Sequence, residues 1–148
     1  MKPVLPAISI DTREQRPWCF PVGVITERVT IQSGDYSLHG LHDRVAIERK
    51  EKGDFIACCT HERERFEREL VRLSKLDFAV VIVECDLSEI LYGIYRSQAR
   101  PESVLGSVAS WMVDYVPFIF TGDRENAVRF AQKLLTKWWQ HHALAEAA

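Results

Sequence analysis

The segment that most limits the possible folds is an unbroken apolar run, Phe78–Glu84, with the sequence Phe-Ala-Val-Val-Ile-Val-Glu. Its length is that of an ordinary strand, and its β-branched residues favour extended backbone. Apolar and polar residues do not alternate within it, which indicates a strand buried on both faces. Such a strand belongs inside a sheet with other elements packed above and below it.

Shorter runs predict further strands around this one. We expect them at Ala7–Asp11, Val22–Ile31, Tyr36–Leu38, Arg44–Lys50 and Pro117–Phe120. Gly34-Asp35 and the segment from Gly40 to Asp43 are typical of tight turns. The first four strands therefore suggest an antiparallel meander.

Helical periodicity is clearest between Glu62 and Lys75, where Phe66, Leu70 and Leu73 repeat at helical spacing among charged residues. Further helices are expected at Phe55–Cys59, from Asp86 or Ser88 to Tyr95, from Pro101 or Glu102 to Tyr115, and from Asp123 to Trp139 with Ala127, Phe130, Ala131, Leu134 and Trp138 facing inward. Strands mixed with helices predict an α/β fold, a mixed β-sheet flanked by helices on both sides. We expect one domain over residues 1–148, with its core at about 7–139.

Composition limits the function. The net charge of −2 argues against bulk non-specific binding of nucleic acid, so any DNA contact must come from a local basic face. No apolar span is long enough for a membrane helix. The four cysteines form no C-x-x-C pair, and the start is not that of a signal peptide, so we expect a reducing, cytoplasmic setting.

The most informative motif is Glu48-Arg49-Lys50, followed after three residues by Asp54. Alternate residues of a strand project to the same face, so Glu48 and Lys50 point together and Arg49 points away. If Asp35 joins them from the preceding turn, two carboxylates converge beside an ammonium group. Converging carboxylates repel each other unless a cation lies between them, and hard oxygen ligands suit Mg²⁺ or Mn²⁺.

An isolated E-x-K triplet is usually a solvated strand end. Here it ends the apolar run Val45-Ala46-Ile47, and Asp35 follows a glycine suited to a tight turn. A further acidic cluster, Asp11-Thr12-Arg13-Glu14, closes another apolar run. Solvation alone does not explain acidic clusters at the ends of several strands.

These motifs in this order resemble the nuclease domain of XPF/MUS81-type structure-specific endonucleases, the ERCC4-domain group within the restriction-endonuclease-like superfamily. The resemblance extends through Arg65-Phe66-(x2)-Glu69-Leu70, although the family often has glutamine at the position of Glu69. It continues over Val80–Glu84 and Val104–Ser110, and covers about residues 7–135.

The resemblance implies a role for each residue of the motifs. Asp35 and Glu48 would bind the metal with the main-chain carbonyl of Arg49, and Glu14 and Asp11 would complete the acidic set. Lys50 would orient the attacking water and touch the scissile phosphate. Further assignments are Arg13 as a phosphate ligand and Arg65 and Lys52 as DNA contacts.

Two residues keep alternative interpretations. Asp54 is either a helix N-cap or a second-shell partner of Lys50 or Arg49. Trp18 either stacks on a base or, more in keeping with its position, packs in the core.

The family resemblance also implies a homodimer, for which Trp111, Trp138 and Trp139 are candidate anchors. No helix-hairpin-helix module follows the last expected helix, so a partner protein could supply DNA specificity. The small size suggests a bacterial or phage-encoded protein. We expect an endonuclease that cuts branched or structured DNA (forks, flaps or junctions); the alternative is a non-catalytic DNA-binding or dimerisation subunit.

Overall fold

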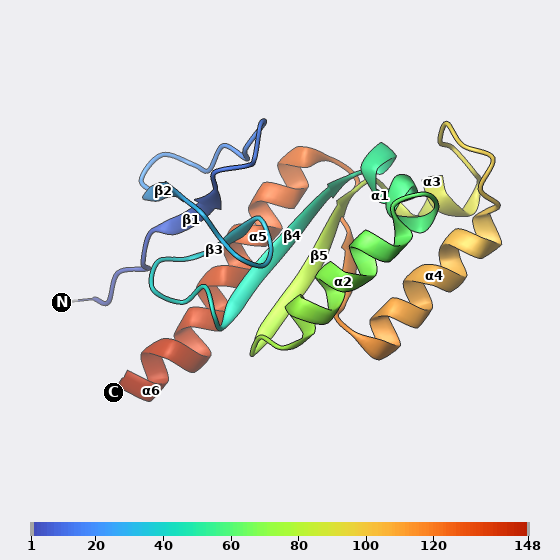
Figure 1. Ribbon diagram of the computed structural model, residues 1–148. Helices are drawn as coiled ribbons and strands as arrows, with labels where there is room; N and C mark the ends of the chain where they lie inside the picture. The colour runs from blue at the N-terminus through green and yellow to red at the C-terminus, as the bar shows by residue number, and fades with distance from the viewer. Residues whose placement is uncertain (1, 148) are drawn as a thin grey trace.

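The computed structural model describes residues 2–147, and in them a single sheet has the strand order β2-β1-β3-β4-β5-β6 (Figure 1). The strands are β1 (Ile8–Asp11), β2 (Thr26–Val29), β3 (Tyr36–Leu38), β4 (Val45–Glu51), β5 (Phe78–Glu84) and β6 (Phe118–Phe120). The helices are α1 (Lys52–Cys59), α2 (Arg63–Ser74), α3 (Leu87–Leu91), α4 (Pro101–Asp114), α5 (Arg124–Trp138) and α6 (Ala145–Ala147), with the π-helical segment η1 (Trp139–Leu144) before α6.

Strand β5 occupies the range predicted for it and lies between β4 and β6, parallel to both. Its central residues are buried on both faces, which confirms the interpretation of the apolar run. Val81 and Val83 face one apolar cluster, and Val80 and Ile82 face the other.

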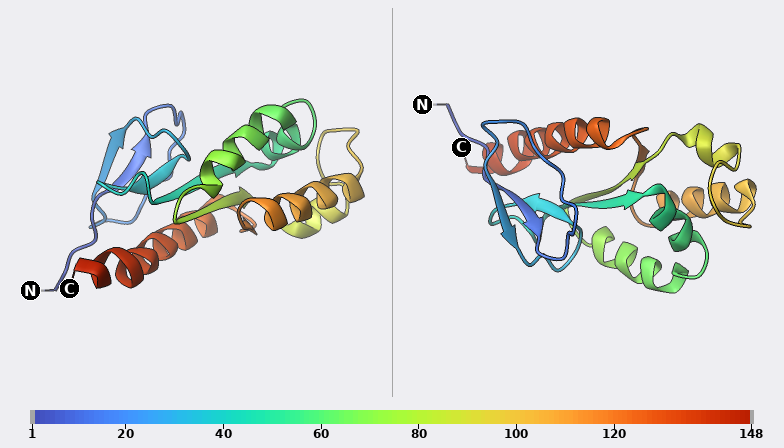
Figure 2. Two further views of the ribbon diagram at one scale, coloured as in Figure 1. Left: turned by 60° about the horizontal axis from the view of Figure 1, so that its bottom comes forward. Right: turned by 90° about the horizontal axis from the view of Figure 1, so that it is seen from above.

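Helices cover both faces of this sheet. Phe66 of α2 and Trp111 of α4 pack with Phe55 of α1 in one cluster, while Ala131 and Leu135 of α5 belong to the other. The right-hand view of Figure 2 places α2 and α5 on opposite sides of β4 and β5. The prediction of a mixed sheet flanked by helices on both sides is confirmed.

The predicted meander is wrong in part. Strands β1, β3 and β4 pair antiparallel, but β2 pairs in parallel with β1 at the outer edge of the sheet. Strand β2 is also shorter than Val22–Ile31 because a turn precedes it. In that turn the Val24 N–H donates to the Pro21 carbonyl, and Gly23 has a φ of +95°. β-Branched composition alone cannot form a strand across such a turn.

Helices α1 and α3 end or begin at other residues than expected, whereas α5 begins where expected. Helix α1 begins at Lys52 with Glu51 as its N-cap, so Asp54 lies inside the first turn and its N-cap interpretation is wrong. Helix α3 ends at Leu91, short of Tyr95. Helix α5 does begin after Asp123, whose carboxylate accepts the Asn126 N–H at 2.7 Å.

Of the residues predicted to face inward on α5, Phe130 is exposed, whereas Ala127, Ala131 and Trp138 are buried as predicted. Phe130 of α5 is 42% exposed and not inward, whereas Leu135 is buried. Trp111 and Trp138 are buried in the two apolar clusters, so they are not surface anchors for a second subunit. Trp139 is only partly buried.

Trp18 packs in the core. It is buried and stacks on Tyr36, with ring centroids 4.3 Å apart. The core interpretation of Trp18 is therefore confirmed. Within residues 2–147, no helix combines the length and the apolar character that crossing a membrane requires.

Candidate active site

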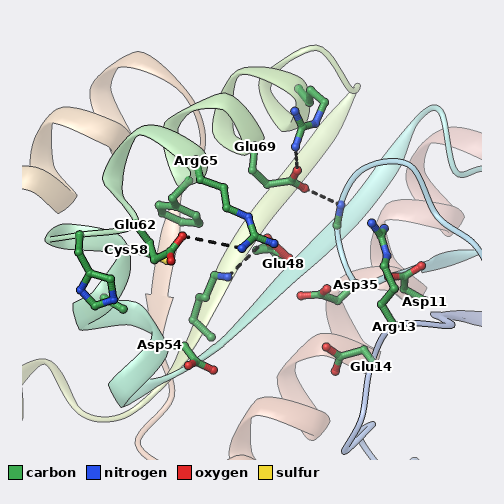
Figure 3. Close-up of a pocket in the computed structure, with 16 residues that line it drawn as sticks. Asp11, Arg13, Glu14, Asp35, Glu48, Asp54, Cys58, Glu62, Arg65 and Glu69 are labelled. Carbon is green, nitrogen blue, oxygen red and sulfur yellow. Dashed lines mark hydrogen bonds and ion pairs between the residues drawn. The ribbon is translucent and has the colours of Figure 1, made fainter.

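Charged residues from four parts of the chain line one groove of about 530 Å³ at the carboxyl end of β4. Figure 3 shows Arg65 and Glu69 of α2 on one side, Asp11, Arg13 and Glu14 on the other, and Asp35 with Glu48 between them. The volume is within the ordinary range for ligand-binding clefts. The motifs singled out in the sequence thus meet in one place.

The alternation expected along β4 is present. Glu48 and Lys50 both line the groove, and the Lys50 Nζ lies 3.9 Å from a Glu48 carboxylate oxygen. The same ammonium lies 5.2 Å from the centre of the Phe66 ring, a cation–π distance. Arg49 points to the opposite face of the sheet, where it binds Glu84.

The Gly34-Asp35 turn brings the second carboxylate against β4. The Asp35 N–H donates to the Ile47 carbonyl at 2.8 Å, and the Arg49 N–H donates to an Asp35 carboxylate oxygen at 2.8 Å. Gly34 has a φ of +86°, and a Cβ there would lie 2.8 Å from the Cβ of Ala46. Only glycine fits this conformation and this close approach.

Glu48 is the most perturbed acid of the groove. Burial raises its pKa well above the ordinary value, and the negative charge of Asp35 and a hydrogen bond between the two carboxyl groups raise it further. Two carboxyl groups this close repel each other when both are charged, and a cation between them would balance the charge.

Lys50 is ammonium at neutral pH. Burial acts to lower its pKa, but the nearby carboxylate of Glu48 and the charges of Asp35 and Asp54 outweigh burial and raise the pKa. Lys50 can thus donate hydrogen bonds and supply positive charge, and it cannot act as a general base. The charge of Asp54 acts on Lys50 from the first turn of α1.

Asp11 and Glu14 reach the groove but are engaged with other partners. The Asp11 carboxylate accepts from Arg13 Nε at 2.7 Å and from the Ile31 N–H at 3.0 Å. Glu14 accepts from the Tyr36 hydroxyl at 3.0 Å. Burial and the charge of Asp35 raise the Glu14 pKa.

Among residues 2–147, no three His, Cys, Asp or Glu side chains lie close enough together to form a metal cluster. The four acids expected to bind metal line one groove, and Asp35 and Glu48 lie close enough for the charge of Asp35 to raise the pKa of Glu48. This pair nevertheless suits a hard divalent ion, because two oxygen-donor groups face each other with too few cations nearby. Two carboxylates with main-chain oxygen and water would complete such a coordination sphere.

The charge of the whole groove is negative. Seven carboxylate side chains line it, against four cationic ones: Arg13, Lys50, Arg65 and Arg72. A phosphodiester would be repelled from such a surface by like charge. Bound divalent cation would reverse that repulsion locally.

The arginines of α2 divide between two faces. Arg65 and Arg72 line the groove, and the Arg65 side chain is 81% exposed with only a 3.8 Å contact to Glu62. Arg63 faces away, where it binds Glu67 and covers the Trp111 ring. Lys52 lies outside the groove, paired with Glu89 at 2.9 Å on the other side of α1.

Sequence reasoning missed the network behind β4. Arg49 binds Glu84, Glu14 and Glu51, at 2.6, 3.3 and 2.8 Å respectively. The Trp18 Nε1–H also donates to Glu84 at 2.7 Å. The only available signal was an acid at the end of the most apolar strand. Such a residue, if buried, needs a cationic or hydrogen-bonding partner.

Comparison with known proteins gives a consistent result. The family model of the ERCC4 domain matches residues 10–134. XPF from Aeropyrum pernix is similar in fold: one structure has a TM-score of 0.69 at 23% identity, over 88% of this chain and 60% of that one. A structure of XPF from Aeropyrum pernix in complex with DNA has a TM-score of 0.71 at 23% identity, over 91% of this chain and 66% of that one.

The match thus covers about 60% of the length of the chain in the first of these structures. No curated protein matches it at a significant level.

Proposed function

Because this chain belongs to the ERCC4-domain family of structure-specific DNA nucleases, we propose that it is an active endonuclease that hydrolyses phosphodiester bonds in branched or structured DNA with Mg²⁺ or Mn²⁺. The observation that carries the proposal is that the carboxyl groups of Asp35 and Glu48 line one groove beside the ammonium of Lys50. A decayed site would have no reason to keep a buried acid in an unfavourable charge state.

Asp35 and Glu48 would hold the metal, helped by the Arg49 carbonyl. A bound divalent ion supplies Lewis-acid charge for the phosphate and makes water more acidic. A carboxyl group must be ionised to bind the ion, so the raised pKa of Glu48 makes metal binding compete with protonation. Glu14 and Asp11 lie in the same groove and would hold water or adjust the charge around the pair.

Lys50 has the role of a fixed cation. Its ammonium can donate to a non-bridging phosphate oxygen or orient the attacking water, and it stabilises negative charge as the reaction proceeds. Glu48 and the Phe66 ring restrict where that ammonium lies. Arg13 has an exposed side chain beside the same groove and suits a phosphate contact.

The DNA strand would cross the groove between Arg13 on one side and Arg65 on the other. Both guanidinium groups are largely exposed, at 68% and 81%. Contacts of this kind position the DNA and carry no sequence information. Lys52 is a weaker candidate DNA contact than the sequence suggested, because its ammonium is already paired with Glu89.

The test is cleavage of labelled fork, flap, Holliday-junction and plain duplex DNA with Mg²⁺ or Mn²⁺. We expect cutting by the wild type and a loss of at least about 100-fold in Asp35→Ala and Glu48→Ala, since each removes a ligand of the metal. Glu64→Ala is the matched control, because Glu64 is exposed on α2 and does not line the groove. Equal cutting by all variants would refute the assignment.

The second candidate is a non-catalytic DNA-binding or dimerisation subunit. Binding of the same DNA set without cutting in either metal would favour it. The clustering of Asp35, Glu48 and Lys50 argues for the enzyme, because a binding subunit needs none of them.

We also propose a homodimer, as the family resemblance implies. Since Trp111 and Trp138 are buried, exposed apolar residues of α4 such as Met112 and Val113 are better candidates for the interface. Light scattering on the purified protein, with Val113→Asp as the variant, tests this part.

A further inference from the structure

Glu69 of α2 contacts the turn that carries Asp35. One Glu69 carboxylate oxygen accepts the Gly34 N–H at 3.0 Å, across 35 positions of sequence, and the other binds the guanidinium of Arg72. The Glu69 side chain is only 17% exposed. Figure 3 shows both contacts at the edge of the groove. Neither contact was expected from the motifs.

Besides the bond from the Arg49 N–H to the Asp35 carboxylate, three hydrogen bonds hold the main chain of the Gly34-Asp35 turn. The Asp35 N–H donates to the Ile47 carbonyl, and the Asp35 carbonyl accepts from the Asp11 N–H at 2.9 Å. These two are main-chain bonds to neighbouring strands, which do not depend on side-chain identity. The third, from the Gly34 N–H, depends on Glu69. It joins the turn to α2 on the far side of the groove.

The position of this turn decides where the Asp35 carboxylate lies relative to Glu48. A glycine with positive φ gives the turn little intrinsic stiffness, so its place depends on what holds it. A partly buried carboxylate is a strong acceptor for a backbone N–H. Glu69 is therefore suited to hold the turn from the helix side while β4 holds it from the sheet side.

We propose that Glu69 is a positioning residue that fixes the Gly34-Asp35 turn against α2 and so sets the separation of the two metal-binding carboxyl groups. The catalytic meaning of this role rests on the proposed function, but the contact itself does not. Glutamine at position 69 would keep an oxygen acceptor for the Gly34 N–H, whereas alanine would not.

The first experiment uses metal-free protein and amide hydrogen exchange of Gly34 followed by NMR. Glu69→Ala is expected to exchange about tenfold faster at Gly34, the size expected for the loss of one partly buried hydrogen bond. Glu69→Gln is expected to stay within about threefold of the wild type, because its side-chain oxygen still accepts.

Glu67→Ala is the matched control. Glu67 lies on the same helix but binds Arg63 and faces Trp111, away from the turn. Wild-type protection of Gly34 in Glu69→Ala would overturn the proposal. If Glu69→Ala fails to fold, Glu69→Asp serves instead, since its shorter side chain cannot reach the Gly34 amide.

The second experiment is a calorimetric titration with Mn²⁺. We expect Glu69→Ala to weaken Mn²⁺ binding by at least about tenfold, as the loss of outer partners of metal ligands commonly does, and Glu69→Gln to retain most of the affinity. Glu67→Ala is again the control and should bind Mn²⁺ as the wild type does, because Glu67 does not line the groove. A residue that only stabilised the fold would lower the melting temperature without changing this affinity.

The two experiments separate the two proposals. If the wild type binds no Mn²⁺, the proposed function fails, and the exchange of Gly34 still decides whether Glu69 holds the turn. If Mn²⁺ binds equally to wild type and Glu69→Ala, the positioning role is refuted while the metal site stands.

Discussion

The two faces of β4 differ in how well their charged side chains are paired with opposite charges. Behind the strand, the Arg49 side chain is 8% exposed and binds three carboxylates, and Trp18 supplies a further hydrogen bond to Glu84. In front of it, the buried Glu48 has the like charge of Asp35 nearby and the ammonium of Lys50 at 3.9 Å. Arg49 thus has several partners of opposite charge, whereas its sequence neighbour Glu48 has too few.

The face behind β4 contributes to the stability of the fold, and the face in front of it serves the proposed function. Buried polar groups that find partners specify the fold, and the network behind β4 holds the strand to β5 and the N-terminal segment. Buried groups without adequate partners cost free energy and are kept where chemistry needs them. The face that costs stability is the one that lines the groove.

The largest expected effect is on the satisfied face. Arg49→Ala leaves buried carboxylates without their cation, which should lower the free energy of unfolding by about 3–5 kcal/mol. Denaturant titration measures this. Arg44→Ala is the control, because Arg44 also binds two carboxylates, Asp77 and Glu146, at a more exposed place. It should cost about 1 kcal/mol or less, and equal losses would remove the contrast.

On the groove face, Lys50→Ala should leave the fold intact and reduce cleavage by roughly 100- to 1,000-fold, the range for removing one preorganised electrostatic group. Mn²⁺ affinity should stay close to that of the wild type, because Lys50 is not a ligand. Single-turnover cleavage and calorimetry measure the two quantities. Wild-type turnover would exclude Lys50 from the mechanism.

Glu48→Gln should have opposite effects on the two properties. It should abolish metal-dependent cleavage, yet it should stabilise the metal-free protein at pH 7.5, since it removes a group whose charged form burial and Asp35 disfavour. Thermal unfolding would then shift to a higher temperature. A lower melting temperature for Glu48→Gln would contradict this account of the groove.

The same residue predicts a pH dependence. The folded-state pKa of Glu48 is raised, so its protonated form stabilises the fold at acid pH, and this contribution is lost as pH rises through the folded pKa. The advantage of Glu48→Gln over the wild type should therefore grow between pH 5 and pH 8 in the absence of metal. Paired denaturant titrations at the two pH values test the sign. Mn²⁺ affinity of the wild type should rise over the same interval, because binding displaces a proton.

The smallest effect concerns the rim of the groove. Arg65→Ala should weaken DNA binding a few-fold and lower the slope of log affinity against log salt by about one. Arg68→Ala is its matched control, since Arg68 is exposed on the same helix but does not line the groove. Fluorescence anisotropy at several salt concentrations would show whether the two arginines differ.

Local patterns predicted much of the fold and half of the site. The limits of β5 and β3, the alternation of Glu48, Arg49 and Lys50, and the cap at Asp123 all follow from periodicity or from contacts within a few residues. The predictions that failed involve longer range or a local turn. The parallel pairing of β2 with β1 and the outward direction of Phe130 depend on neighbours distant in sequence.

The sequence by itself determined that two carboxylates and a lysine could share one face at a strand end, because strand geometry has a fixed period of two. Tertiary structure decided which acids remain available. In the folded protein, the Asp11 carboxylate binds Arg13 and the Ile31 amide. Arg49 binds three carboxylates, and Glu69 accepts a hydrogen bond from Gly34. The physical reason is that charge satisfaction depends on distances of 3–4 Å between segments, and no local pattern encodes the folded separation of residues 35 positions apart.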